Sequence, residues 1–442
     1  MRHSTLTISD YQYLRAFRQL FPPQRLKRAV AARRRPTRDR ALPLWLLLGL
    51  LITWFWVPAD KLPFLLRWVR PGRTKLPSDP AVYLARGRLG WAPLRWLRNH
   101  VRGALATPEL DPSAFHHGRR LLGLDGTTFT VADTPDNAAT FGRANNQHHA
   151  SGYPLIRTVA LCELGTHALI DWSARGYHKS EVELARRLFR RVPPGSLLLG
   201  DRNFHSFDLW DVARKGRFEL LIRVQKGPTL PVQEVLSDGS YRSCVRPRRG
   251  PNKAARAIPV RVIRYCWTDA TGCVHESRVV TSLLDPVAEP AATLVALYHT
   301  RWEQELAFGE VKEQLASRVT HVRAHDPIRA VAELDGLLLG HWVLRWVILQ
   351  AARGAGVAPV AISFVGAVRV LKARLGVPVG RGGWIAWWAA ILTEIGDQRL
   401  RPRRNRQCPR VRKTTRSHWP TKKPTHTAGT LPVLRVVTPS AP

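Results

Sequence analysis

The sequence predicts a mixed α/β protein in which a strand-rich core lies between two helical regions. Apolar residues follow helical spacing through about the first 115 residues and again from residue 291 onward. Between these regions, short apolar runs are separated by glycine and polar turns, which is the pattern of strands. A chain of 442 residues with 45% hydrophobic residues is long enough to bury the cores of two or three domains.

The charge of the chain points to a polyanionic partner. Lys and Arg number 69 against 32 Asp and Glu, which gives a formal net charge of +37 and a pI near 11.4. This excess is far larger than solubility requires, so we expect nucleic acid as the partner. Ribosomal and histone-like proteins share such a charge, but they are usually short and poor in tryptophan, whereas this chain has 16 Trp residues. A basic enzyme that acts on nucleic acid fits better.

The cysteines indicate a reducing, cytoplasmic compartment. The five Cys residues are scattered and form no CxxC pair, and the first residues contain no apolar segment of the kind that a signal peptide needs. Cys266, Cys273 and His275 match no known zinc spacing and lack a fourth partner, so we expect no zinc site there.

One segment supports a rival interpretation as a membrane protein. Residues 41–59 (ALPLWLLLGLLITWFWVPA) carry no charge over 19 residues, which is long enough to cross a bilayer, and they follow an Arg-rich stretch. However, Pro43 and Pro58 lie near the ends of this run, and charged sequence returns directly after it. We therefore expect a buried helix and no membrane span.

Residues 1–115 are predicted to form a helical DNA-binding domain. Arginines gather at 33–40, directly before the apolar run. Further along, residues 77–100 (PSDPAVYLARGRLGWAPLRWLRNH) predict two short helices with a helix-turn-helix-like outline. Arg86 and Arg88 in this outline are candidate DNA contacts, although similar outlines also occur in plain helical bundles.

The middle of the chain predicts a defined order of strands and helices. We expect three strands in an antiparallel meander, a helix, a fourth strand, a second helix and a fifth strand. Their ranges are 121–131, 153–164, 167–176, 180–192, 195–201, 206–216 and 218–227. Ser180 and Glu183 predict a capping box at the start of the first helix. This order is that of an RNase H-like core.

The regions after the fifth strand complete the predicted organisation. A β insertion is expected at about 228–286, between the fifth strand and the next helix. We expect the core domain to span 116–325, a helical C-terminal region to span 326–398, and a basic, disordered tail that tethers DNA to span 399–442. The tail contains no acidic residue.

Three acidic residues lie where this fold would bring them together. Asp125 is in the first strand, Asp201 directly follows the fourth, and Glu305 is on a later helix. An Asp among apolar strand neighbours costs several kcal/mol to bury unless it is paired or holds a cation. Asp201 is expected at the edge of the sheet that the carboxyl ends of the strands form. Ligands of α/β folds usually bind at this edge. We expect Gly126 to leave room beside Asp125 for a metal ion or a phosphate backbone, whereas the alternative for Asp125 is an ordinary turn residue.

The helix that contains Glu305 also carries basic and aromatic residues at helical spacing. We expect one face of this helix to carry Tyr298, Arg301, Glu305 and Lys312. This face would be acidic at one point, and it would bind phosphate around that point. The alternative is an ordinary solvated helix surface with ion pairs. Glu303 is a competing carboxylate, but it lies about 200° from Glu305 around the helix, so we favour Glu305.

These residues resemble the DDE transposases of bacterial insertion sequences, in the insertion-sequence-four branch. That branch carries the signature Y-x2-R-x3-E-x6-K, and YHTRWEQELAFGEVK fits it in full at residues 298–312. LDGT around Asp125 and GDRNF around Asp201 are similar to the other two blocks of that branch. The resemblance spans roughly residues 15–350.

The resemblance implies a transposase that cleaves DNA at the ends of an insertion sequence and joins those ends to target DNA. Asp125, Asp201 and Glu305 would hold two divalent ions, about 3.5 to 4 Å apart, for in-line attack at phosphorus. Mg²⁺ is the expected ion, and Mn²⁺ would be able to replace it.

The resemblance also implies DNA contacts and partners. Tyr298, Arg301 and Lys312 would hold phosphates near the cleaved end, with Arg202 as a further contact. Trp267 in the insertion is a candidate for stacking on a flipped base, against the alternative of a cross-strand packing residue. The expected partners are double-stranded DNA, as terminal inverted repeats and target, and a second copy of the chain in a homodimeric synaptic complex.

Two further interpretations stay open beside the transposase. A catalytically inactive DNA-binding remnant would keep the charge and the fold, but the intact acidic positions argue against decay. A repair or restriction nuclease on the same fold would share the metal site without strand transfer, and the spacing of the signature disfavours it.

Overall fold

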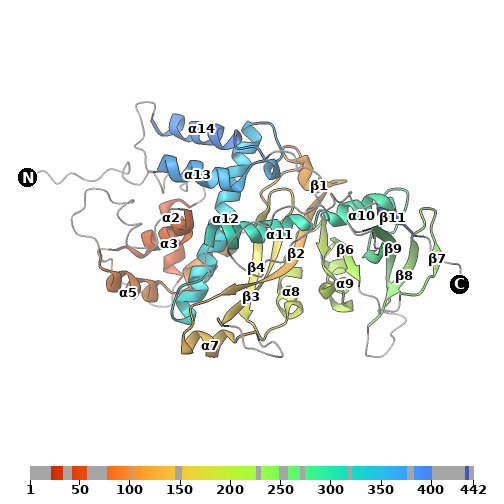
Figure 1. The fold of residues 1–442 in the computed structure, drawn as a ribbon, viewed down its shortest axis with the longest axis horizontal. Coiled ribbons are helices and arrows are strands. Elements are labelled where there is room, and N and C mark those ends of the chain that lie inside the picture. Colours follow the sequence, from red (N-terminus) through yellow and green to blue (C-terminus); the bar gives the residue numbers. More distant parts are fainter. Residues whose placement is uncertain are drawn as a thin grey trace, which may run out of the picture. The chain divides into compact units, whose positions relative to one another are not determined.

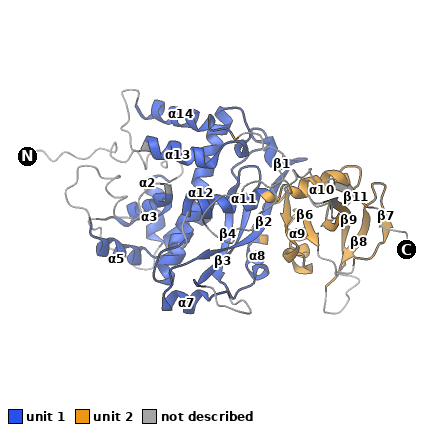
Figure 2. Ribbon diagram, in the orientation of Figure 1, with its two compact units in different colours: residues 1–188, 303–399 blue, residues 189–302, 400–442 orange. Residues whose placement is uncertain are grey.

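The computed structural model describes residues 21–32, 42–56, 77–101, 103–144, 152–224, 230–247, 257–268, 274–316, 321–375, 383–400 and 434–437. The arginines at 33–40 and most of the basic tail lie outside these residues. The chain divides into two compact units, which Figure 2 colours separately. The first unit comprises residues 1–188 and 303–399, and the second comprises 189–302 and 400–442.

The first unit contains the predicted three-stranded meander (Figure 1). β2 (Arg119–Thr130) pairs antiparallel with β3 (Leu155–Glu163), and β3 pairs antiparallel with β4 (Ala168–Gly176). The short β1 (Phe115–His116) pairs with the start of β2. The register places Asp125 in the middle of the β2–β3 ladder. The prediction of three antiparallel strands is confirmed.

The elements after the meander follow in the predicted order. α8 (Glu181–Phe189) comes next, and the hydroxyl of Ser180 accepts a hydrogen bond of 3.2 Å from a backbone N–H in its first turn. In the second unit, β5 (Ser196–Gly200) pairs in parallel with β6 (Glu219–Val224), and α9 (Phe207–Gly216) connects the two strands. The chain is therefore an α/β protein with the order of elements of an RNase H-like core.

The β insertion also lies where the sequence predicts it. β10 (Val274–Thr281) pairs antiparallel with both β6 and β9 (Ile258–Thr268). β8 (Tyr241–Val245) pairs antiparallel with β9, and β7 (Glu234–Val235) pairs antiparallel with β8. The insertion therefore extends the sheet of the second unit by antiparallel strands.

The tail contains a strand that the sequence analysis did not predict. β11 (Leu434–Val436) pairs antiparallel with residues 265–267 of β9. On that side of β9, β8 pairs only with residues 258–262, so the edge beyond residue 262 offers unpaired backbone groups. The prediction of a disordered tail over 399–442 is therefore wrong for this segment.

One long helix forms the centre of the first unit. α12 (Pro327–Gly354) begins at Asp326, whose carboxylate accepts a hydrogen bond of 3.1 Å from the backbone N–H of Arg329. The helix is buried on nearly all sides and contacts β4, α3, α6, α13 and α14. The shorter helical elements are α2 (Pro23–Ala31), α5 (Asp79–Leu89), α6 (Ala92–Val101), α7 (Pro135–Phe141), α13 (Phe364–Leu375), α14 (Gly383–Gly396), η2 (Trp54–Trp56), η3 (Pro112–Ala114), η4 (Arg202–Phe204) and η6 (Pro359–Ala361).

The apolar run at 41–59 forms a buried helix over its described part. α3 (Leu44–Thr53) is about 15 Å long at 1.5 Å per residue, half the thickness of a hydrocarbon core. It packs against α12, α2 and α5, and nearly every residue in it is buried. Among the described residues, no helix has the length and hydropathy that crossing a bilayer requires.

The helix predicted from residue 291 onward is interrupted. α10 (Ala291–His299) ends at Thr300, whose hydroxyl donates a hydrogen bond of 2.7 Å to the carbonyl oxygen of Leu297. α11 (Trp302–Gly309) then begins, and the π-helix η5 (Glu310–Ala316) continues it. Residues 298 and 305 therefore lie on separate helices, and the prediction of one continuous helix over residues 298–312 is wrong.

Close packing of α12 on α3 predicts a stability effect at Gly336. A Cβ atom at this position would lie 2.8 Å from the carbonyl oxygen of Leu51, so α3 or α12 would have to move. We expect Gly336→Ala to lower the free energy of unfolding by about 1 to 3 kcal/mol, measured by urea denaturation. Gly354→Ala in the same helix is the control, because a Cβ there meets no atom within 4 Å. Equal stability of Gly336→Ala and the unchanged protein would contradict this packing.

Candidate active site

The face of β2 that carries Asp125 is covered by the helical segment that contains Glu305. Side chains 123, 125 and 127 share this face, because alternate residues of a strand point the same way. The side chain of Gln304 lies over Gly123, where a Cβ would be 2.4 Å from its Oε1. Lys312 Nζ donates a hydrogen bond of 3.4 Å to Thr127 Oγ1. The segment therefore contacts the strand on both sides of Asp125.

A second contact fixes α11 on the sheet. Gln304 Nε2 donates a hydrogen bond of 2.9 Å to the carbonyl oxygen of Ala160, which pairs with Asp125 in the β2–β3 ladder. Gln304 is fully buried, so this bond lies inside the first unit. Glu305 is the next residue and is half-buried. Within the first unit, two of the three predicted carboxylates therefore belong to elements that pack directly on one another.

The space beside Gly126 is occupied by another side chain. The side chain of Glu181, the first residue of α8, fills it, because a Cβ on Gly126 would lie 2.6 Å from the carboxyl carbon of Glu181. The prediction that Gly126 leaves room for a ligand is therefore wrong. Gly126 does contribute its backbone N–H, which donates a hydrogen bond of 2.8 Å to Asp125 Oδ1.

In the second unit, Asp201 lies at the carboxyl end of β5, as predicted. It directly precedes η4, and Arg202 at the start of η4 is exposed. The Oδ1 atom of Asp201 is buried and accepts no hydrogen bond from the described residues. Arg223 on β6 has its Nη2 3.4 Å from this oxygen. Asp201 thus presents a carboxylate oxygen beside a guanidinium.

Tyr298 is buried close to the same charges. Burial raises the pKa of its hydroxyl to about 12, and the positive charge of Arg301 opposes this shift. Asp201 and Arg223 lie close enough to act on the same hydroxyl, with opposite effects. The hydroxyl has no hydrogen-bond partner among the described residues. Tyr298 is therefore a neutral donor next to two arginines.

A buried ion pair in the insertion fixes the start of the helix that carries Tyr298. The fully buried Arg261 pairs with Asp238, and its Nη1 donates a hydrogen bond of 2.6 Å to the carbonyl oxygen of Glu289. Asp238 Oδ2 accepts a hydrogen bond of 2.8 Å from the N–H of Ala291, the first residue of α10. Although burial alone would raise the pKa of Asp238, hydrogen bonds from Ser240 and Ala291 hold it below its usual value.

His321 is a polar residue beside β2 that the sequence analysis missed. His321 Nδ1 accepts a hydrogen bond of 3.1 Å from the backbone N–H of Thr130 on β2. Burial, and then the charge of Lys312, lower the pKa of His321 to about 4. Burial also lowers the pKa of Lys312. No local pattern marks His321, whereas Arg223 could have been noticed as a charged residue inside an apolar strand.

The remaining candidate DNA contacts have different surroundings. Arg86 faces inward, with Nη2 2.8 Å from the carboxylate of the fully buried Glu333. Arg88 lies in the last turn of α5 and is half-buried. The backbone of Trp267 pairs with β10 on one side and β11 on the other, and its side chain lies outside the described residues.

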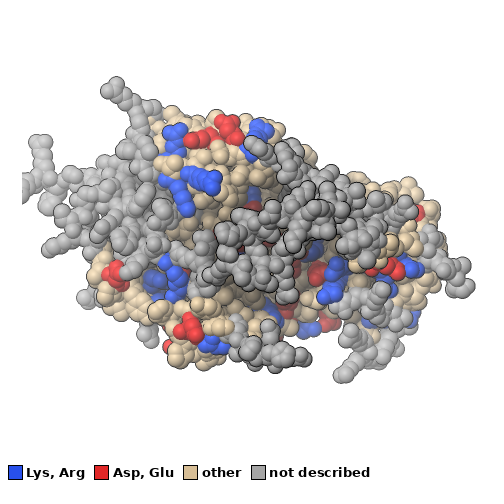
Figure 3. Space-filling model, in the orientation of Figure 1, with Lys and Arg blue, Asp and Glu red and all other residues tan. Residues whose placement is uncertain are grey.

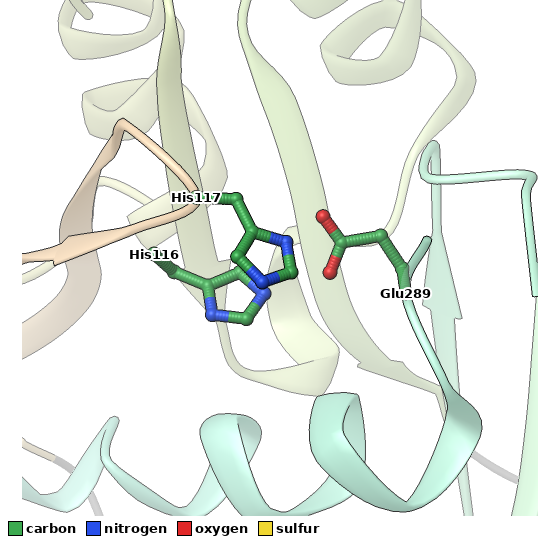
Figure 4. Close-up of side chains that lie close together, drawn as sticks. All are labelled: His116, His117 and Glu289. Carbon is green, nitrogen blue, oxygen red and sulfur yellow. The ribbon is translucent and has the colours of Figure 1, made fainter. Parts of the chain in front are cut away.

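Figure 4 shows a pair of histidines near the end of β1. His116 and His117 stack on one another with ring centroids 4.2 Å apart. Glu289, which is drawn with them, belongs to the second unit, where it precedes α10. We assign no metal site to these three residues.

Comparisons of the chain with protein families and with known proteins point to one family. Residues 116–342 match the sequence model of the family described as "Transposase DDE domain". The chain is 27% identical over 435 residues to "Transposase InsG for insertion sequence element IS4" of Escherichia coli strain K12, a match that covers 95% of each chain. It is also 36% identical over 133 residues to "Putative transposase InsZ" of the same strain, which covers 29% of this chain and 43% of the relative.

Among solved structures, the chain is similar to a piggyBac transposase in a synaptic complex with hairpin DNA. The identity is 13% and the TM-score is 0.42, with 86% of this chain and 85% of the other covered.

The low pKa of His321 predicts a specific pH dependence of stability. A folded pKa of about 4 against the ordinary 6.5 means that the folded protein prefers the neutral ring. This contribution is complete above pH 6.5 and is lost as the pH falls toward 4. His321→Asn keeps an acceptor for Thr130 but does not titrate. We therefore expect its free energy of unfolding to fall less steeply than that of the unchanged protein between pH 6.5 and 4. Parallel curves would contradict this assignment.

Proposed function

This chain belongs to the family of DDE transposases of insertion sequences, and we propose that it cuts DNA at the ends of such an element and joins those ends to target DNA. The observation that carries the proposal is the packing of α11 and η5 along the Asp125 face of β2. Contacts at Gln304 and Lys312 lie on both sides of Asp125 and bring the Glu305 segment to that face.

We infer that Asp125, Asp201 and Glu305 together hold two Mg²⁺ ions, which Mn²⁺ is able to replace. The buried Oδ1 of Asp201, which accepts no hydrogen bond from the described residues, suits a cation ligand, and carboxylate oxygens are the ligands that Mg²⁺ prefers. Bound there, the two ions would activate the attacking oxygen and stabilise the leaving oxygen of an in-line displacement at phosphorus.

The basic residues around these carboxylates are suited to hold the DNA backbone. Arg223 and Arg301 lie near Asp201, and Lys312 is tied to the Asp125 face by its bond to Thr127. Guanidinium and ammonium groups bind phosphate oxygens by charge-assisted hydrogen bonds. We propose that they hold the phosphates beside the cleaved bond, first while water attacks and later while the 3′-hydroxyl of the element end attacks the target.

The α5–α6 surface offers a second region for DNA. Arg95 lies over the ring of Trp91 at 4.2 Å, and Arg329 lies over the ring of Tyr83 at 3.8 Å. Both aromatic rings are exposed. In Figure 3, the described Lys and Arg side chains occur at several places on the drawn face. We propose that Arg88 and Arg95 contact the phosphates of the inverted repeats, and that two copies of the chain act on paired ends.

A catalytically inactive DNA-binding remnant is the alternative. It would keep the charge and the fold, but its three acidic residues would have no catalytic role and could be replaced by other residues. All three acidic positions and the full signature are present in this chain, which favours the active enzyme.

Substitution of Glu305 tests the proposed reaction. We expect Glu305→Gln to lose DNA cleavage by about 10³-fold or more, because metal ions contribute several kcal/mol of transition-state stabilisation. Binding to DNA ends and thermal unfolding should stay unchanged. The assay uses purified protein, Mg²⁺ and duplexes that carry the terminal repeats flanking the encoding gene, and it measures cleavage and strand transfer separately.

Glu313→Gln is the matched control, because Glu313 is an exposed carboxylate on η5. We expect this variant to cleave DNA as fast as the unchanged protein does. In the same assay, Arg223→Gln should weaken end binding and reduce its salt dependence, as expected for the loss of one phosphate contact. Binding without any cutting by the unchanged protein on these ends would favour the inactive remnant. Cutting that survives Glu305→Gln would contradict the assignment of the carboxylates.

A further inference from the structure

Five ionisable side chains in the first unit form a buried network that the proposed reaction does not use. They are His167, Glu303, Glu310, His341 and Arg345. His167 is at the centre of one half, where each of its ring nitrogens faces a carboxylate. Nδ1 is 2.8 Å from Glu310 Oε1, and Nε2 is 2.7 Å from Glu303 Oε2.

Glu310 is the centre of the other half. Arg345 Nε donates a hydrogen bond of 2.8 Å to Oε2, and Arg345 Nη2 donates to Oε1. His341 Nε2 is 2.9 Å from the same Oε2. Although burial alone would raise the pKa of Glu310, Arg345 and His167 hold it well below its usual range. Glu310 is therefore a buried anion, and the removal of a partner would leave its charge uncompensated.

The backbone conformation of His167 is one that non-glycine residues rarely adopt. Its φ is 59°, in the left-handed region that favours glycine, within the turn between β3 and β4. A non-glycine residue in such a conformation stores strain and persists only where its surroundings hold it. Two carboxylates on one helical segment hold this ring.

The two carboxylates flank Glu305 on that segment. Glu303 lies two residues before it and points about 200° away around the helix axis, so holding Glu303 against His167 also fixes the direction of Glu305. Glu310 lies five residues after it, at the point where α11 changes into the π-helix η5. Local π-helical geometry often occurs at functional sites because it shifts the helical phase of the residues around it.

We propose that this network, through His167, Glu303, Glu310 and Arg345, sets the rotation of residues 302–316 and so positions the carboxylate of Glu305 for cation binding. The inference rests on the proposed function and makes these four positioning residues, because they act through Glu305. It also gives a role to His341 and Arg345, which interrupt the apolar sequence of α12.

Substitution of His167 tests the inference most cleanly. Asn tolerates the left-handed backbone but cannot reach both carboxylates, so His167→Asn removes the bridge without adding strain. We expect normal binding to DNA ends, but a Mg²⁺ concentration for half-maximal cleavage that is about 10-fold higher or more. In the metal-free protein, hydrogen exchange of residues 302–316 should become faster.

Glu303 provides a second variant with a conservative partner. Its side chain is 23% exposed, so the fold tolerates a change there more easily than at Glu310. Glu303→Leu should reproduce both effects of His167→Asn. Glu303→Gln keeps an acceptor oxygen for the ring, so its Mg²⁺ concentration for half-maximal cleavage should stay close to that of the unchanged protein.

Arg353→Met is the matched control on the same helix. Arg353 Nη2 lies 2.6 Å from the carboxylate of Asp111, which is 2% exposed, so the variant also breaks a buried ion pair of α12. We expect it to lower stability without changing the Mg²⁺ requirement or the exchange of residues 302–316. This separates positioning from general destabilisation.

The outcomes distinguish the two proposals. Faster exchange and a raised Mg²⁺ requirement in His167→Asn and Glu303→Leu, but not in Arg353→Met, would support the positioning network. Unchanged exchange and an unchanged Mg²⁺ requirement in both variants would overturn it, as would equal effects in Arg353→Met. If the unchanged protein does not cut DNA, the proposed function fails, and the exchange measurement still decides whether the network holds the segment.

Discussion

The docking of residues 302–316 along β2 is the constraint on which the rest of the site depends. Gln304 packs where only Gly123 leaves space, and Lys312 bonds to Thr127 farther along the same strand face. A shift of one residue in helical phase would turn Glu305 by about 100°, because an α-helix has 3.6 residues per turn. The position of a single carboxylate therefore rests on several contacts between this helical segment and one face of the sheet.

Each of the two helices that carry the transposase signature is fixed by a buried arginine. Arg261 and Asp238 hold the first residue of α10 in the second unit, and Arg345 and Glu310 hold the segment of α11 and η5 in the first. Buried ion pairs of this kind contribute little net stability, because desolvation offsets their attraction. Their directional hydrogen bonds fix the orientation of a helix more tightly than apolar contacts do, which suits a site where carboxylates must converge.

Local sequence patterns were sufficient to predict the order of elements, the meander around Asp125 and the place of Asp201 after β5, because strand alternation and turn residues act over a few positions. The break at Thr300 was not predictable, since a helix-compatible sequence continues through it. Contacts between distant segments were equally hidden: Glu181 fills the space at Gly126, and His167 meets a helix more than a hundred residues away. Such contacts leave no periodic signal in the sequence.

The central claim is that three carboxylates from distant parts of the chain form one cation site, and iron-directed cleavage of the protein tests it most directly. Fe²⁺ in place of Mg²⁺, with ascorbate and peroxide, cuts a polypeptide next to the residues that bind the ion. We predict cuts close to Asp125, Asp201 and Glu305, all suppressed by excess Mg²⁺ and all lost when any one of the three is replaced by its amide. Cuts that omit Asp201, or that persist after these substitutions, would contradict the account.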